Sequence, residues 1–304
     1  MHEHFNPADA NLLARRYLDS LLIEERLVDA QVPDLTLELW GETFASPVMT
    51  PAFSHLKPYA EGRESGMLEY SRAAAEANLV NWVGMMENDD YQRILSTGAR
   101  TIRIIKPYAD RDKVLDQLAC AARGGSLAVG MDIDHIFGKD GYDVVLGEPM
   151  TRQTMDDLKN YVAATPLPFV VKGVLSVQDA VKCAEAGVKG IVVSHHHGRL
   201  PYALPPLMIL PHIAKALSGS DVKIFVDCAI ERGADVFKAL ALGANGVSLG
   251  RHMLPALQEG GVDGLKAYFA GIHQELAFIM GFTGCCTLSD PEPSMLWHHG
   301  SPLE

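Results

Sequence analysis

The chain has 304 residues, a length that one α/β barrel can fill as a single domain. Its 48% apolar and 21% charged residues are typical of a globular protein, and its net charge of −12 argues against nucleic acid or an anionic membrane as partner, because both are bound through basic patches. The sequence has no apolar run long enough for a membrane helix and does not open with the basic-then-apolar order of a signal peptide, so we expect a cytoplasmic protein. The five cysteines are scattered and odd in number, which favours reduced thiols over a disulfide framework or a zinc site.

Eight short apolar runs, rich in Val and Ile, recur along the chain, with helix-like segments between them. The runs lie at residues 47–53, 81–85, 101–105, 127–132, 169–173, 190–194, 223–227 and 246–250. Such runs are typical of parallel strands buried on both faces, and the intervening helices imply right-handed crossovers. Eight units close a barrel, although an open doubly wound sheet has the same local pattern. We therefore predict an α/β fold, a single (β/α)8 TIM barrel that spans residues 1–304.

Segments outside these runs are expected to be accessory. Residues 1–46 form an N-terminal cover in this interpretation, with a helix over 12–26 and a short segment at 36–44 at the bottom of the barrel. Apolar spacing predicts an amphipathic helix over 264–282. The tail at 285–304 contains Pro and polar residues and is expected to lie loosely on the surface.

Polar residues stand where the later runs end. They are Asp132 and Asp134 after the fourth run, Lys172 at the end of the fifth, Ser194 to Arg199 after the sixth, Asp227 after the seventh, and Gly250 with Arg251 after the eighth. Because the reacting groups of a TIM barrel come from the C-terminal ends of its strands, we expect these side chains to face one mouth. A histidine can take a proton near neutral pH, and an arginine can grip a carboxylate with two hydrogen bonds. Gly250 and Arg251 stand where barrels often bind a phosphate.

Plainer interpretations of the same residues stay open. The three histidines at 195–197 could be metal ligands, or loop residues that only make hydrogen bonds. Consecutive side chains point in different directions, so we predict no metal site. Lys172 could be one half of a salt bridge across the mouth, to Asp132 or Asp227, because a buried ammonium needs an anionic partner.

Three stretches carry a resemblance to a known family: KGVLSVQDAVKCAEAGVKGIVVSHHHGR at 172–199, DCAIERGADVFKALALGANGVSLGR at 227–251 and ELAFIMGFTG at 275–284. They resemble the second half of the FMN-dependent α-hydroxy-acid oxidases and dehydrogenases, which include glycolate oxidase and lactate oxidase. Weaker similarity at 25–29, 41–53 and 109–125 lets nearly the whole chain align in order. The resemblance implies FMN as cofactor, oxidation of a small 2-hydroxy acid, and a homo-oligomer, a tetramer or larger.

The resemblance also implies roles for single residues. His196 matches the base that takes the proton of the substrate's hydroxyl, and Arg199 matches the clamp for the carboxylate. Lys172 matches a catalytic lysine that faces the flavin and stabilises negative charge on the reduced ring. The implied cofactor contacts are Lys172, Ser194, Asp227, Ala229, Gly250 and Arg251, with Arg232 expected to compensate for the phosphate-binding arginine that Glu231 replaces. The implied substrate contacts are Arg199 and His196, with Tyr108 in place of a family tyrosine and His135 in place of a family arginine.

The flavin site departs from the family pattern. The family's Asp-Gly-Gly-Ile/Val-Arg is replaced by DCAIE at 227–231, where Cys228 and Ala229 take the place of glycines and Glu231 that of a phosphate-binding arginine. Ile104 removes a flavin hydrogen-bond partner, and Gly130 stands where a flavin-contacting threonine is usual. Two alternatives to flavin-dependent oxidation therefore stay open. One is a flavin-free lyase, isomerase or epimerase on a hydroxy- or keto-acid, and the other is a non-catalytic binding protein on the same scaffold.

Overall fold

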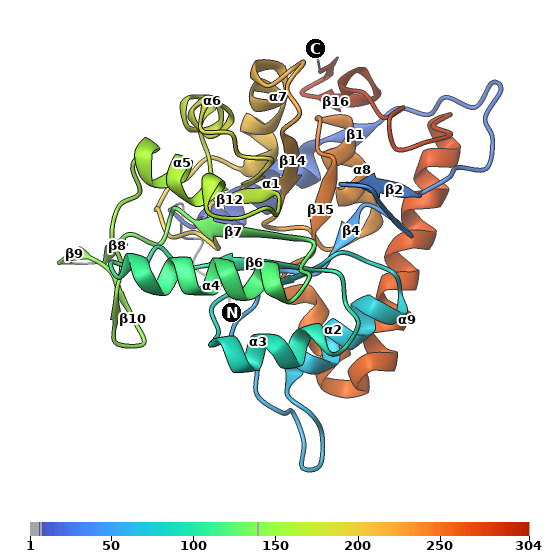
Figure 1. The fold of residues 1–304 in the computed structure, drawn as a ribbon. Coiled ribbons are helices and arrows are strands. Elements are labelled where there is room, and N and C mark those ends of the chain that lie inside the picture. The colour runs from blue at the N-terminus through green and yellow to red at the C-terminus, as the bar shows by residue number, and fades with distance from the viewer. Residues whose placement is uncertain (1–5, 7, 139, 304) are drawn as a thin grey trace.

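The computed structural model describes residues 6, 8–138 and 140–303 and shows a barrel of parallel strands surrounded by helices (Figure 1). The barrel strands are β4 Val48–Met49, β5 Asn81–Val83, β6 Thr101–Ile105, β7 Ala128–Asp132, β12 Phe169–Val174, β13 Gly190–Val193, β14 Lys223–Val226 and β15 Gly246–Ser248. They lie in the order β4-β15-β14-β13-β12-β7-β6-β5, and parallel bridges from Met49 to Val80 and from Phe53 to Val83 bring β4 beside β5. The predicted TIM barrel is confirmed.

Alternate side chains of these strands point into the barrel and towards the helices. Ile102 and Ile104 of β6 pack inside the barrel with Trp82 and Phe225, whose rings lie 5.3 Å apart in an edge-on arrangement. Ile105, the next residue along the strand, belongs to the larger apolar cluster beneath the helices. Strands buried on both faces explain why the runs are apolar throughout and do not alternate with polar residues.

A hairpin covers the N-terminal end of the barrel. It consists of β2 Leu37–Leu39 and β3 Glu42–Phe44, which pair antiparallel. Leu39 and Phe44 are buried in the interior cluster, and the Trp40 ring lies 5.9 Å from that of Phe225. The hairpin thus lies at the bottom of the barrel, where residues 36–44 were predicted to lie.

The outer layer is helical. Its helices are α2 Gly66–Glu76, α3 Asn88–Leu95, α4 Arg111–Arg123, α5 Met155–Ala163, α6 Val177–Glu185, α7 Pro206–Ala216, α8 Gly233–Ala241 and α9 Leu254–Phe282. Their start points are set by side-chain caps where the chain offers them: the hydroxyl of Ser176 accepts from the N–H of Asp179 at the start of α6. The amphipathic helix predicted at 264–282 is the second part of α9, which bends at Gly261, a residue with φ 56°.

The first helix corrects one expectation. α1, Ala10–Ser20, does not lie at the bottom of the barrel but at the mouth, where Asn11 Nδ2 donates to the carbonyl of His197 and Arg15 Nη1 to that of Ala229. The helix ends at Ser20 and not at residue 26, since Leu21 is already extended. Amphipathic spacing identifies the apolar face of a helix but not the end of the barrel on which that face packs.

The C-terminal tail, residues 285–304, corrects a second expectation. β16, Leu296–His298, pairs antiparallel with β1, Leu22–Ile23, and then with β17, Ser301–Pro302. Leu296 is completely buried, and Trp297 Nε1 donates to Glu24 Oε2 over 2.7 Å. A short η2 turn at Pro293–Met295 precedes the strand. The tail is therefore fixed to the chain near residue 22 and does not lie loosely, because its strand β16 pairs with β1 and buries Leu296.

Two small hairpins follow β7 and form what we call the 137–149 segment. β8 Phe137–Gly138 pairs with β9 Gly141–Tyr142, and β10 Val144–Val145 pairs with β11 Glu148–Pro149. In Figure 1 this segment projects from the barrel near α4 and α5.

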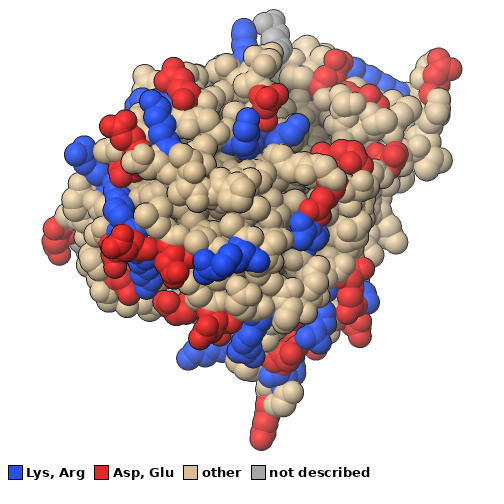
Figure 2. All heavy atoms as spheres, in the orientation of Figure 1, with Lys and Arg blue, Asp and Glu red and all other residues tan. Residues whose placement is uncertain are grey.

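Two surface properties bear on partners. On the face seen in Figure 2, basic and acidic side chains are intermixed, so the residues coloured there form no continuous basic area. Among the described residues, no helix has the length and apolar character needed to cross a membrane.

Candidate active site at the barrel mouth

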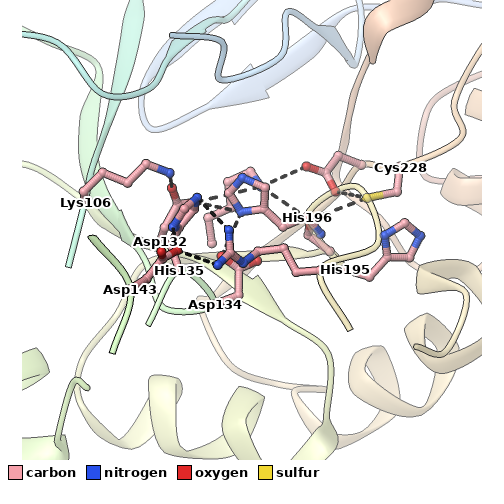
Figure 3. A network of polar contacts seen from close by, with 12 residues as sticks. Lys106, Asp132, Asp134, His135, Asp143, His195, His196 and Cys228 are labelled. Carbon is pink, nitrogen blue, oxygen red and sulfur yellow. Dashed lines mark hydrogen bonds and ion pairs between the residues drawn. The ribbon is translucent and has the colours of Figure 1, made fainter. Parts of the chain in front are cut away.

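The ends of β6, β7, β12 and β14 bring a network of buried charges together at the mouth (Figure 3). Lys172 Nζ lies 3.2 Å from Asp227 Oδ2, 3.9 Å from Asp132 Oδ1 and 3.4 Å from the hydroxyl of Ser194. Lys106, which directly follows β6, forms an ion pair with the other oxygen of Asp132. The salt bridge that the sequence allowed for Lys172 is thus present, with both of its expected partners.

The charges in this network stabilise one another. Burial alone would favour the neutral forms, but the ammonium of Lys106, with the charges of His196 and Lys172, holds the pKa of Asp132 well below its usual value. Burial likewise opposes the charge of Lys172, but Asp227 and Asp132 raise the pKa of its ammonium well above its usual value. Lys172 therefore stays charged at the wall of the mouth.

His196 is held by a carboxylate at the edge of this network. Its Nδ1 lies 2.8 Å from Asp134 Oδ1 and 3.8 Å from Asp132 Oδ1. The backbone N–H of His196 donates to Ser194 Oγ, and the residue has φ 46°, a left-handed conformation that is uncommon outside glycine. Because Nδ1 is engaged with Asp134, the other ring nitrogen is left for a ligand, and His196 does line the adjacent cavity.

Arg199 and His135 lie together beside His196, but Arg199 is already occupied by a carboxylate. Its Nη2 donates to Asp143 Oδ2 over 2.7 Å and to the carbonyl of Phe137 over 3.0 Å, and its Nη1 contacts His135 Nε2 at 2.9 Å. The rings of His135 and His196 lie edge to face, 5.2 Å apart. Burial, with the nearby charges of Lys106 and Arg199, lowers the pKa of His135 to about 4, so its ring is neutral at pH 7.

A cavity of about 370 Å³ opens from this cluster towards α1 and the start of α9, within the size range of small-ligand sites. Lys172, His196 and Asp227 line it on one side, and Gly250 and Arg251 line it as well. Its apolar and small residues are Leu12, Pro51, Ala52, Phe53, Cys228, Ala229, Ile230 and Leu249, and further polar side chains line it at Asn11, Arg15, His197, Glu231 and His252.

The loop after β14 keeps a left-handed backbone although it lacks glycine. Cys228 has φ 73° and Ala229 has φ 60°, and α1 holds the loop through the bond from Arg15 to the carbonyl of Ala229. The Cys228 thiol donates to Asp227 Oδ1 over 2.9 Å, and burial, together with that carboxylate, raises the pKa of the thiol to about 12. Left-handed residues expose successive backbone N–H groups that can bind an anion.

The end of the cavity near α9 holds both signs of charge. Arg251 begins the η1 turn, Arg251–Met253, and is exposed. Glu231 also lines the cavity, with Oε1 3.0 Å from His252 Nε2 and 4.0 Å from Arg15 Nη1. Arg232, expected to compensate for Glu231, is half-exposed and lies 4.0 Å from Asp19 and from Asp235, so it is directed towards other carboxylates.

Several predicted residues lie elsewhere. Tyr108 is completely buried beneath α4 with Lys113 Nζ 4.8 Å from its ring centre, so it does not join the cluster at the mouth. Ile104 faces the apolar interior of the barrel. At Gly130 a Cβ would lie 2.1 Å from the carbonyl oxygen of Val170, so a threonine does not fit this position without movement of a neighbouring strand.

Two residues of the site, Lys106 and Asp143, were not predicted from the sequence. Lys106 directly follows the run at 101–105, so the strand-end rule that selected Lys172 would have found it too. Asp134 was noted at a strand end but not as the partner of His196. Asp143 lies in the 137–149 segment, and no strand-end or spacing rule points to it.

The residues at the mouth fit an FMN molecule better than a metal ion. The cavity offers Lys172 and Arg251 as cations, the left-handed backbone at Cys228, and apolar walls, while Glu231 is the group that opposes a phosphate. Asp132, Asp134 and His196 place ligand atoms within 4.8 Å of one another. Both Lys106 and Lys172 are ion-paired with Asp132, however, and their positive charge disfavours a cation at this spot.

Comparisons with known proteins agree with this fit. The family model described as FMN-dependent dehydrogenase matches residues 12–153 and 142–298. The chain is 28% identical to the peroxisomal (S)-2-hydroxyacid oxidase GLO3 of Arabidopsis thaliana over 87% of its own length and 81% of that protein. It is 39% identical to the L-lactate oxidase of a Roseobacter species, over 52% of its own length and 43% of that protein.

A solved structure is similar over nearly the whole fold. It is that of mandelate oxidase with benzoyl-formic acid, with a TM-score of 0.85 and 26% identity, over 98% of this chain and 92% of that one. The predicted resemblance is thereby confirmed, and with it the expectation of an oxidoreductase fold whose family cofactor is FMN. The chain belongs to the family of FMN-dependent dehydrogenases.

Proposed function

We propose that this protein oxidises a small 2-hydroxy acid to the corresponding 2-keto acid with FMN in the cavity at the barrel mouth. The observation that carries the proposal is the placement of His196: Asp134 anchors its Nδ1 over 2.8 Å, and the ring lines a cavity that Lys172 also lines. When bound, FMN supplies the acceptor for the hydride equivalent that leaves the α-carbon of the substrate. Lys172, Ser194, Asp227, Ala229, Gly250 and Arg251 are the residues proposed to hold it.

His196 is proposed as the base. Its free ring nitrogen takes the hydroxyl proton of the substrate, which becomes a carbonyl as the hydride equivalent departs. The imidazolium that forms is stabilised by Asp134 at 2.8 Å and by Asp132 at 3.8 Å. The two carboxylates also hold the ring orientation, so they are positioning residues for the proton transfer.

The carboxylate of the substrate is assigned to Arg199 and His135. Arg199 presents a planar set of donors that matches a carboxylate, and the neutral ring of His135 contributes one N–H. Both side chains lie beside His196, which supports a substrate bound with its α-carbon next to the proposed base. Tyr108 has no role in this proposal, since it is buried away from the mouth. A cytoplasmic location and a tetramer or larger oligomer stay predictions.

The test uses the purified protein reconstituted with FMN. Flavin absorbance should be bleached under anaerobic conditions by a member of a panel of glycolate, lactate and mandelate. His196→Asn should retain FMN absorbance but lose turnover by a factor of about 10² to 10⁴, the usual contribution of a general base. His212→Asn, at an exposed position of α7, is the matched control and should keep full turnover.

The same experiment separates the alternatives. The carboxylate of Glu231 in the cavity favours a protein that binds flavin weakly, which is the observation behind a flavin-free lyase, isomerase or epimerase. Conversion of a hydroxy acid that continues after complete removal of FMN would support that alternative and overturn the oxidation. A binding protein would show ligand binding with no conversion under either condition.

A further inference from the structure

We propose that Asp143 occupies, from within the chain, the place of the substrate's carboxylate, so that the 137–149 segment must release it before substrate binds. This inference rests on the proposed function, in which Arg199 and His135 hold the substrate. It adds that the protein is self-inhibited by its own carboxylate.

The contacts of Asp143 are those of a bound carboxylate. Oδ2 accepts from Arg199 Nη2 over 2.7 Å and lies 3.0 Å from His135 Nδ1, while Oδ1 accepts from the N–H of Val144 over 2.9 Å. Burial disfavours the charge of Asp143, but Arg199 outweighs it and lowers the pKa of this carboxyl. One oxygen thus accepts a hydrogen bond from the guanidinium and lies next to the imidazole, whose Nδ1 makes no hydrogen bond. These are the two groups assigned to the substrate.

A second carboxylate cannot bind to the same donors at the same time. Arg199 Nη2 is divided between Asp143 and the carbonyl of Phe137, and Nη1 is turned to His135. A substrate carboxylate would have to replace Asp143 on Nη2. The replacement is an exchange of like for like, because a carboxylate leaves the arginine as another arrives.

The segment that carries Asp143 is built to move. Its large apolar side chains are mostly outside the core: Phe137 is 66% exposed and Leu146 is 72% exposed. The rings of Phe137 and Tyr142 stack on each other and not on the barrel. Little apolar area therefore opposes opening, and segments of this kind unfold locally at low cost.

The end of the segment is fixed. Met150 is buried, and its N–H donates to the carbonyl of Asp143 over 2.8 Å. Glu148 is held by Lys113 of α4 over 2.9 Å, and the N–H of Ala109 donates to Pro149. Motion is therefore expected from 137 to about 147, and it breaks the ion pair of Asp143 with Arg199 together with the two backbone hydrogen bonds of Asp143, to Ile136 and to Met150.

The test compares Asp143→Asn with Asp140→Asn in the FMN-loaded protein. Asp140 is an exposed carboxylate of the same segment, so its removal changes the net charge equally. The affinity for glyoxylate, pyruvate and benzoylformate is measured by calorimetry, with pyruvamide as a ligand that has no carboxylate. Hydrogen–deuterium exchange of the 137–149 amides is followed in the same samples.

We expect Asp143→Asn to tighten binding of the 2-keto acids about tenfold, equivalent to about 1.4 kcal/mol, to leave pyruvamide unchanged, and to speed exchange in the segment. Asp140→Asn should change none of these. If the keto acids bind but both variants bind them as the wild type does, the self-inhibition is wrong and the proposed function stands. If no keto acid binds to any of the proteins, both proposals are wrong.

Discussion

Replacement of Lys106 by methionine tests the buried charge network that the strand ends create. Lys106 is 7% exposed and Asp132 is 2% exposed, so the variant removes one ammonium and leaves a buried carboxylate behind. Loss of one member of a buried pair costs about 3–5 kcal/mol of unfolding free energy. Asp132 retains Lys172 at 3.9 Å and His196 at 3.8 Å, which offsets part of that loss. We therefore expect a destabilisation of about 3 kcal/mol at pH 7, at the lower end of that range.

The loss should depend on pH in a defined direction. The pKa of Asp132 is held low in the folded protein by Lys106, despite burial. The stability that the ionised Asp132 contributes is therefore fully present at pH values above the pKa of this carboxyl in the unfolded chain, and is lost as the pH falls through its lower pKa in the folded protein. Without Lys106 the folded pKa rises, and protonation then removes the unpaired buried charge. The difference between wild type and variant should therefore be largest near pH 7 and shrink towards and below about pH 4, where an unfolded aspartic acid titrates.

Urea unfolding followed by circular dichroism at pH 7 and pH 4 measures both effects. Lys113→Met is the control: that lysine is 21% exposed and pairs with Glu148 at 2.9 Å and with the exposed Glu87 at 3.3 Å. Surface pairs of this kind contribute about 0–1 kcal/mol. If Lys106→Met costs no more than Lys113→Met, or costs the same at both pH values, the network does not stabilise the mouth as reasoned.

Three further changes have defined outcomes. Glu231→Gln removes the carboxylate that lines the cavity with Arg251; FMN should then bind about tenfold more tightly by fluorescence quenching, with riboflavin unchanged, and an unaltered FMN affinity would contradict a phosphate beside Glu231. Gly130→Ala places a Cβ 2.1 Å from the carbonyl oxygen of Val170. The free energy of unfolding should fall by about 3 kcal/mol or more, and an unchanged urea midpoint would refute the clash. Ala229→Gly relieves a residue with φ 60°; the free energy of unfolding should rise by about 1 kcal/mol, and a lower melting temperature would count against strain in this loop.

The strands could be predicted because each is a physical necessity of the barrel. A parallel strand between interior and helices needs apolar side chains on both faces, and the runs at 101–105 and 190–194 show this directly. The convergence of Lys172, His196 and Asp227 followed from topology, since the strand ends of a barrel meet at one mouth. These residues are found there.

The partners of those residues could not be predicted in the same way. The hydrogen bond from Arg15 to the carbonyl of Ala229 joins positions 214 residues apart. The apolar face of α1 can be read from the sequence, but the end of the barrel on which that face packs cannot. The contact of Asp143 with Arg199 depends on the path of the 137–149 segment, whose sequence has no regular period. Packing of accessory elements on the barrel decides both, and local sequence pattern does not contain that information.

The small sheet of β1 and β16 connects distant parts of the chain to the site. Leu22 and Ile23 of β1 pair with Trp297 and Leu296 of β16. The strand β1 begins at Leu22, two residues after Ser20, where α1 ends, and α1 is a helix that lines the cavity. Removal of residues 296–303 would take away the strand that pairs with β1, so α1 would be held only by its own contacts, such as those of Asn11 with His197 and of Arg15 with Ala229. A deletion at this end therefore acts on the chain next to a helix that lines the cavity, although none of residues 296–303 lines the cavity itself.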